Sequence, residues 1–250
     1  MPWREKFEIN GIYHLYNRGV EKIPIFRDDF DRVRFLEILD EFNYEESFSL
    51  SLRQIRDLKK ISSSRNDILK RRGERLVKIV SFCLMSNHYH LLVRQCIENG
   101  VTKFMRKVNT GYAKYFNSKH ERSGGLFQNR FKSVKMISDA QLIHTTEYIH
   151  LNPLKILPQN NNLKANEKLE KYIWSSFKDF VGLVSYPDIC MPEIIKDLQG
   201  GINGYKGSIN AWAKRKDDQL KAEIGLQKTG FCRSPSSASY PQGENWQGGL

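Results

Sequence analysis

The 250-residue sequence has few cysteines and no long apolar run, and each absence argues against a class of protein. The four cysteines are far apart and form no Cys-x-x-Cys unit, so neither a zinc cluster nor a disulfide framework is expected, and the thiols should be reduced. No apolar stretch approaches the roughly 20 residues that a membrane helix needs. The first residues also lack the pattern of a signal peptide. We therefore expect a cytoplasmic protein without membrane contact.

Acidic residues are scarce beside basic ones. The chain has 40 Lys and Arg against 28 Asp and Glu, a formal net charge of +12. Residues 51–78 carry ten basic and three acidic residues, and residues 101–135 carry nine and one. Charge gathered into two segments is typical of a surface that binds the phosphates of nucleic acid. A solvated basic face without a partner is the alternative, and basicity alone names no reaction.

The hydrophobic fraction of 40% is enough for one globular core. Alternation and short apolar runs predict strands, while apolar residues at helical spacing predict helices that start near Asp28, Thr102 and Ser138. The order, with a central hairpin, predicts an α+β fold with helices packed on one face of the sheet. The predicted strands are 9–18, 76–84, 89–93 and 131–137, and the predicted helices are 28–42, 102–117 and 140–151.

The chain divides into three predicted parts. Residues 1–182 form the main domain, with a basic insertion at about 49–75. Residues 183–233 form a C-terminal extension that we expect to be helical. Residues 234–250 are rich in Gly, Ser and Pro, and this composition predicts a disordered tail.

The local pattern most suggestive of chemistry is His88-Tyr89-His90 at the start of a buried strand. Residues two apart on a strand point to the same face, so the two imidazoles lie side by side. Two neutral imidazoles in this arrangement are able to share one divalent metal ion. The alternative is a pair of polar residues on a sheet surface that form local hydrogen bonds.

A second pattern is the polar stripe of His144, Tyr148 and Asn152, whose spacing of four places all three on one face of a helix. A phenol has a pKa of about 10 and is a poor nucleophile unless a cation stabilises the negative charge that develops. The Asn152 carbonyl oxygen would suit a hard cation such as Mg²⁺ or Mn²⁺. Alternatively, Tyr148 packs against the sheet and Asn152 only ends the helix before Pro153.

A third pattern, residues 124–133, places two glycines before aromatic residues interleaved with Arg and Lys. This composition suits a segment that stacks bases and binds phosphates, although an ordinary surface hairpin would look similar. Together with the two basic segments, it predicts a DNA-binding set: Arg71, Arg72, Lys103, Arg106, Lys107, Phe127, Asn129, Arg130 and Lys132.

Five motifs occur in an order that resembles the IS200-like transposases, and in particular the REP-associated tyrosine transposases among the HUH single-strand nucleases. They are YHLYNRG (13–19), MSNHYHLLV (85–93), LFQNRFKS (126–133), EYIHLNPLK (147–155) and WSSF (174–177). The resemblance spans residues 9–182. It implies a ferredoxin-like antiparallel sheet, single-stranded DNA with a hairpin as partner, and a location near the nucleoid.

The resemblance also implies roles for individual residues. The paired histidines of the HUH motif fall on His88 and His90, the nucleophilic tyrosine on Tyr148, and the polar residue that completes a Mg²⁺ or Mn²⁺ site on Asn152. The implied reaction cleaves single-stranded DNA beside a hairpin through a 5′-phosphotyrosine and later rejoins it. His14, His144 and His150 receive no role, and we expect at most one of them behind the metal ligands.

Two other functions are compatible with these residues. One is a catalytically idle protein that binds hairpin DNA on the same scaffold. The other is a metal hydrolase that uses water, with Tyr148 as a structural residue. Relatives with swapped active sites form homodimers, whereas REP-associated relatives act alone, so the resemblance leaves both states open.

Overall fold

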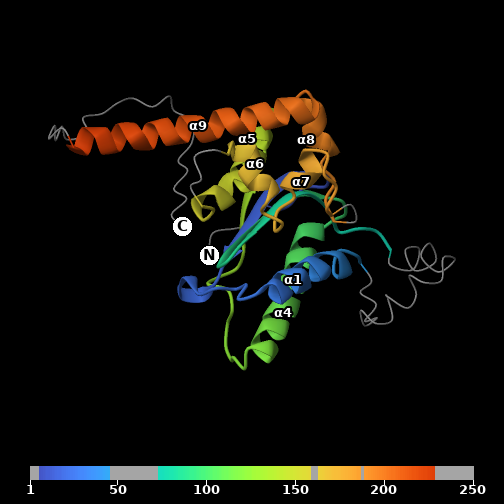
Figure 1. Cartoon of the computed structure of the whole chain (residues 1–250). Coiled ribbons are helices and arrows are strands. Elements are labelled where there is room, and N and C mark those ends of the chain that lie inside the picture. The colour runs from blue at the N-terminus through green and yellow to red at the C-terminus, as the bar shows by residue number, and fades with distance from the viewer. Residues whose placement is uncertain (1–5, 46–72, 159–162, 187–188, 229–250) are drawn as a thin grey trace. The chain divides into compact units, whose positions relative to one another are not determined.

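The computed structural model describes residues 6–45, 73–158, 163–186 and 189–228 (Figure 1). Its contacts divide the chain into two units, Met1–Asn210 and Ala211–Leu250. The elements in chain order are β1 (Ile12–Arg18), η1 (Val20–Lys22), α1 (Asp29–Glu41), β2 (Val77–Met85), β3 (His88–Gln95), α4 (Gly100–Lys119), β4 (Lys132–Lys135), α5 (Asp139–Leu151), η2 (Asn152–Lys155), α6 (Ala165–Glu170), α7 (Phe177–Phe180), α8 (Glu193–Leu198) and α9 (Gly201–Lys228).

The four strands form one antiparallel sheet in the order β2-β3-β1-β4. With α1 between β1 and β2, and α4 between β3 and β4, this is the ferredoxin-like arrangement, so the predicted fold class is confirmed. The β2–β3 hairpin is the predicted one, and each predicted strand and helix is present with slightly different bounds. Because β1 and β3 are central, their side chains are covered on both faces.

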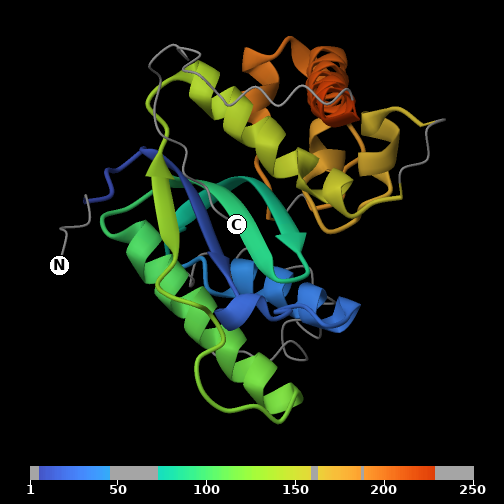
Figure 2. The same cartoon turned by 90° about the vertical axis from the view of Figure 1, so that its left-hand side faces the viewer.

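Helices cover both faces of the sheet (Figure 2). The ferredoxin-like helices α1 and α4 lie on one face, where the ring of Tyr89 from β3 packs 5.0 Å from that of Phe35. The other face carries α5, followed by α6, α7 and α8. The prediction of helices on one face therefore holds for α1 and α4, while α5 brings its residues to the opposite face, which includes His88 and His90.

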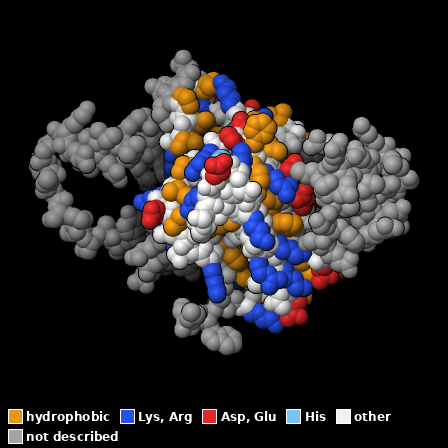
Figure 3. All heavy atoms as spheres, turned by 90° about the horizontal axis from the view of Figure 1, so that it is seen from below, with side chains coloured by type: hydrophobic (Ala, Val, Ile, Leu, Met, Phe, Trp, Pro, Cys, Tyr) orange, Lys and Arg blue, Asp and Glu red, His pale blue; other side chains and the backbone are white. Residues whose placement is uncertain are grey.

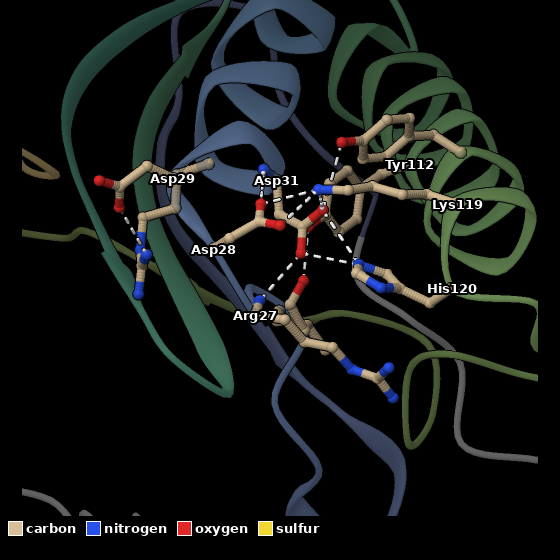
Figure 4. A network of polar contacts seen from close by, with 10 residues as sticks. Arg27, Asp28, Asp29, Asp31, Tyr112, Lys119 and His120 are labelled. Carbon is tan, nitrogen blue, oxygen red and sulfur yellow. Dashed lines mark hydrogen bonds and ion pairs between the residues drawn. The ribbon is translucent and has the colours of Figure 1, made fainter.

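The N-terminus of α1 is tied to the C-terminus of α4 by an acidic clasp of Asp28, Asp31, Lys119 and His120 (Figure 4). The fully buried Asp31 carboxylate accepts hydrogen bonds from Lys119 Nζ at 2.8 Å, His120 Nε2 at 3.0 Å and the Arg27 backbone N–H at 2.9 Å. Burial acts to raise the pKa of Asp31, but these bonds outweigh it and the pKa is lowered. Asp31 therefore stays charged, and both oxygens of its carboxylate accept hydrogen bonds.

Three details differ from the sequence-based expectations. Helix α4 begins at Gly100 and not at Thr102, because a Cβ at residue 100 would lie 2.2 Å from the Leu76 carbonyl oxygen and only glycine fits this close approach. Phe30 and Val33 are among the apolar residues at helical spacing in the predicted helix 28–42, yet 75% of Phe30 and 45% of Val33 are exposed. The helical path also continues through Asn152, since Pro153 is tolerated in the first turn of η2.

Several predictions concern residues outside the described ranges. These are most of the basic insertion at 49–75, with Arg71 and Arg72, and the tail at 234–250. The domain boundary at residue 182 stays a prediction. Within the described part of the chain, no helix has the length and hydropathy to cross a membrane.

Candidate functional site

The first side chains of β3 place two imidazoles on the sheet face that α5 covers. The rings of His88 and His90 lie 5.1 Å apart, as their spacing on one strand predicts. His88 Nδ1 lies 2.6 Å from Asn87 Oδ1, and the Asn87 amide nitrogen donates to the Lys22 carbonyl. Because Oδ1 can only accept, Nδ1 of His88 carries the proton and Nε2 bears the lone pair.

A third imidazole joins them from β1. His14 Nε2 lies 2.9 Å from His90 Nδ1, and the two rings stack 5.1 Å apart. Strand pairing places Tyr16 directly opposite His90 and His14 opposite Leu92, so His14 and Tyr16 reach the same face. We call His14, His88 and His90 the imidazole cluster. Three of its buried nitrogens have no hydrogen-bond partner: His14 Nδ1, His88 Nε2 and His90 Nε2.

Burial keeps this cluster uncharged at neutral pH. It lowers the pKa of His14 to about 4, and that of His88 to about 4 with a further contribution from Lys155 and Arg18. The pKa of His90 is lowered more, first by burial and then by its neighbours His14, His88 and Lys155. Neutral imidazoles offer lone pairs, which is the form that binds metal ions.

Helix α5 brings Tyr148 to the cluster. Ser138 caps the helix by accepting from the Gln141 backbone N–H at 3.2 Å, which fixes its start. Ten residues further on, the Tyr148 ring lies 5.6 Å from the ring of His90 and 6.4 Å from that of His14. The histidines and the tyrosine come from one chain, so no second copy is needed to bring them together.

Asn152 and Lys155 follow Tyr148 on the same side of the helical path. The Asn152 amide nitrogen donates to the Tyr148 backbone carbonyl at 2.9 Å, and its Oδ1 accepts from Lys155 Nζ at 3.3 Å. The ammonium of Lys155 also lies 5.9 Å from the centre of the Tyr148 ring. Burial raises the pKa of the Tyr148 phenol, while the Asn152 side chain acts in the opposite direction. The net shift is upward, because Tyr16 also raises the pKa of Tyr148, so the phenol is protonated at neutral pH.

The residues fit a divalent cation through two unpartnered nitrogens, His88 Nε2 and His90 Nε2. No group of three His, Cys, Asp or Glu side chains suited to a metal occurs in the described part of the chain. The amide oxygen of Asn152, water and phosphate would have to supply the remaining ligands, as is common for Mg²⁺. Asn152 Oδ1 already accepts from Lys155 Nζ, and its second lone pair is left for a cation.

On the face of α5 opposite Tyr148, His150 and Glu147 are hydrogen-bonded to later segments of the chain, and we call these contacts the α5 anchor. His150 Nδ1 is hydrogen-bonded to the Tyr205 hydroxyl, and His150 Nε2 lies 2.8 Å from Ser176 Oγ. Glu147 accepts from the Gln199 amide at 2.9 Å and from the Ser208 hydroxyl. These bonds flank Tyr148 on both sides along the helix and fix which face of α5 meets the sheet.

The predicted DNA-binding residues fall into two groups. Lys103 pairs with Glu45 at 3.4 Å, Lys107 donates to the Tyr44 carbonyl at 2.7 Å, and the Phe127 ring packs 5.9 Å from Tyr89. The others that lie in the described part of the chain are exposed, and in the view of Figure 3 Lys and Arg side chains gather in patches among hydrophobic ones. The exposed predicted residues are Arg106, Asn129, Arg130 and Lys132.

Sequence reasoning left three neighbours of the cluster without a role: His14, Tyr16 and Lys155. The alternation in YHLYNRG puts His14 and Tyr16 on one strand face, but only the pairing of β1 with β3 shows that they meet His90. Lys155 stands seven residues after Tyr148, a spacing of two helical turns that would have placed it on the same side. His144, expected in the stripe with Tyr148, is exposed.

Part of the chain is similar to a known family of proteins. Residues 53–152 match the family model described as transposase IS200-like. The resemblance drawn from the motifs is confirmed. The matched region contains His88, His90, Tyr148 and Asn152. A comparison with curated proteins found no close match to the chain.

Two solved structures are also similar to this chain. One is a REP-associated tyrosine transposase bound to a REP hairpin, with 13% identity and a TM-score of 0.41, covering 76% of this chain and 91% of that one. The other, from Deinococcus radiodurans and described as a transposase, has 14% identity and a TM-score of 0.32, covering 60% and 92%. At these scores neither structure adds to the case for function.

Proposed function

We propose that this protein cleaves and rejoins single-stranded DNA beside a hairpin, with Tyr148 as nucleophile and with Mg²⁺ or Mn²⁺ held by His88, His90 and Asn152. The observation that carries the proposal is the meeting of Tyr148 with His90, 5.6 Å between ring centres, at a point where His90 Nε2 is buried without a partner. The match to the IS200-like family supports a reaction of this class.

In the proposed reaction, the Tyr148 hydroxyl oxygen attacks a backbone phosphorus atom. The new oxygen–phosphorus bond forms as the bond from phosphorus to the 3′ oxygen breaks. The phenolic proton passes to solvent and the departing 3′ oxygen takes up a proton, which leaves a 5′-phosphotyrosine and a free 3′-hydroxyl. A later attack by a 3′-hydroxyl reverses the exchange, because the covalent link preserves the energy of the phosphodiester.

The chain's own residues prepare this attack. The α5 anchor fixes the side of the helix that Tyr148 occupies. Lys155 places positive charge near the phenol, and Arg18 adds to the positive potential at His88. A bound divalent cation would polarise the phosphate and offset its charge. Arg106, Arg130 and Lys132 would hold flanking phosphates, so binding should weaken steeply with salt.

The test is a 5′- and 3′-labelled single-stranded hairpin incubated with Mn²⁺ and resolved on a denaturing gel. The wild-type protein should give a protein–DNA adduct of retarded mobility. Tyr148→Phe should give none, and His88→Ala should lower adduct formation by about 100-fold or more. His144→Gln, an exposed change on the same helix, is the matched control.

Other outcomes identify the alternatives. Salt-sensitive binding of the hairpin without any cleavage by the wild-type protein would indicate an idle DNA-binding protein. Cleavage that survives Tyr148→Phe but is lost in His88→Ala would indicate a metal hydrolase that uses water. Either result contradicts the proposed nucleophile.

A further inference from the structure

Each ligand histidine needs its proton on the nitrogen that faces away from the metal. For His88 the structure supplies the reason, since Nδ1–H donates to Asn87 Oδ1. His90 has no such amide oxygen at its Nδ1. Its neighbour there is another imidazole, His14 Nε2, at 2.9 Å. Either ring is able to donate, so the bond allows two arrangements of protons.

The two arrangements differ in what they leave at His90 Nε2. If His14 donates, His90 is protonated on Nε2 and has no lone pair there. If His90 donates, its Nε2 is an unprotonated nitrogen, and His14 carries its own proton on Nδ1. Only the second arrangement gives His88 and His90 matching Nε2 lone pairs, both buried and both without a partner.

We infer that His14 is a positioning residue, whose Nε2 accepts the Nδ1–H of His90 and thereby fixes His90 in the tautomer that binds the metal. This inference rests on the proposed metal site. Outer hydrogen bonds of this kind orient ligand histidines and hold their tautomers, and their loss typically costs about 10–100-fold in metal affinity. A β1 residue thus acts on a β3 ligand 76 positions away in the sequence.

The burial of His14 supports the acceptor role. Only 2% of its surface is exposed, and a neutral imidazole has one unprotonated nitrogen that is able to accept a hydrogen bond. The stacked rings, 5.1 Å apart with 26° between their planes, and the antiparallel pairing of β1 with β3 hold the two residues in register. Both rings are buried, with 2% of each residue exposed, so the surrounding side chains restrict their rotation.

The first measurement uses the metal-free wild-type protein labelled with ¹⁵N-histidine. Long-range ¹H–¹⁵N correlation spectra distinguish protonated from unprotonated ring nitrogens. We expect His90 to be protonated on Nδ1 and unprotonated on Nε2. A His90 protonated on Nε2 would overturn the inference, whatever the activity of the protein.

The second measurement is Mn²⁺ affinity, by calorimetric titration without DNA. His14→Phe keeps a ring but removes the acceptor, and should weaken Mn²⁺ binding about 10–100-fold. His14→Gln, which offers an amide oxygen near the position of Nε2, should recover most of it, and His144→Gln should bind as the wild type does. Circular dichroism checks that each variant is folded.

The outcomes separate the two proposals. Unchanged Mn²⁺ affinity in a folded His14→Phe protein contradicts the role of His14 alone. A wild-type protein that does not bind Mn²⁺ contradicts the proposed metal site, while the tautomer of His90 still decides what His14 does. If His14→Phe fails to fold, the wild-type spectrum and His14→Gln supply the decision.

Discussion

The acidic clasp and the imidazole cluster are both buried groups of polar side chains, yet they are built in opposite ways. In the clasp, Asp31 is charged and its carboxylate accepts from a lysine, a histidine and a backbone N–H. In the imidazole cluster, the rings are neutral and three buried nitrogens lack a partner. A buried polar atom without a hydrogen-bond partner lowers the stability of the fold. Such an atom is therefore typical of a site where a bound ligand supplies the missing partner. The comparison separates a stabilising network from a candidate site.

The largest expected effect is on the clasp side. Asp31→Asn should lower the free energy of unfolding by about 2–3 kcal/mol, because Lys119 and His120 lose the negative charge to which they donate. Lys119 is partly exposed, and this exposure keeps the loss below that of a fully buried ion pair. The change in the free energy of unfolding is measured by urea denaturation. Mn²⁺ affinity should not change, and a large loss of affinity would break the distinction between the two groups.

The same variant has a pH signature. The pKa of folded Asp31 is lowered, so its contribution is present above its unfolded pKa of about 3.9 and is lost as the pH falls below that value. The difference between wild type and variant should therefore be constant from pH 7 to 5 and shrink at lower pH. Asp29→Asn, an exposed change with a surface pair to Arg32, is the control and should cost less than about 0.5 kcal/mol.

A smaller effect is expected beside the imidazole cluster. Lys155→Gln removes an exposed ammonium near Tyr148, so stability should not change, while the rate of adduct formation should fall about 10-fold because charge stabilisation is lost. Mn²⁺ affinity should rise several-fold, on the order of what removing one nearby positive charge gives. Single-turnover gels and calorimetric titration measure the two, with Lys114→Gln on α4 as control.

A lower rate of adduct formation together with a higher Mn²⁺ affinity would support a role for Lys155 at the site, since loss of a purely structural lysine would change neither quantity. A fall in both quantities would contradict the assignment of Lys155 as a cation that stabilises charge at the phenol and repels the metal ion.

The smallest effect is expected at the α5 anchor, which is a third buried polar group. Tyr205→Phe removes the hydroxyl bonded to His150 and should lower the free energy of unfolding by about 1 kcal/mol. Because the bond lies on the face of α5 opposite Tyr148, Mn²⁺ affinity should stay as in the wild type. Tyr186→Phe, near the surface, should cost less; an equal loss in both would argue against a special role for the anchor.

The sequence by itself determined what depends on local periodicity. Alternation along β3 places His88 and His90 on one face, and a spacing of four places Tyr148 and Asn152 on one side of a helix. Element order led to the α+β class, and the resemblance to a family pointed to Tyr148 as the proposed nucleophile before any distance was known. The IS200-like match agrees with the predicted family, and the sheet order agrees with the predicted fold class.

Only the tertiary structure decided which residues from distant segments meet. The register between β1 and β3 brings His14 to His90, and helix packing brings Asp31 to Lys119, 88 positions away, and Tyr205 to His150. Packing also brings Lys103 to Glu45 and Lys107 to the Tyr44 carbonyl, contacts that composition did not predict, while their binding to DNA stays a prediction. Local patterns fix the direction of a side chain along its own element, whereas its partner is chosen by register and packing, which no short stretch of sequence encodes.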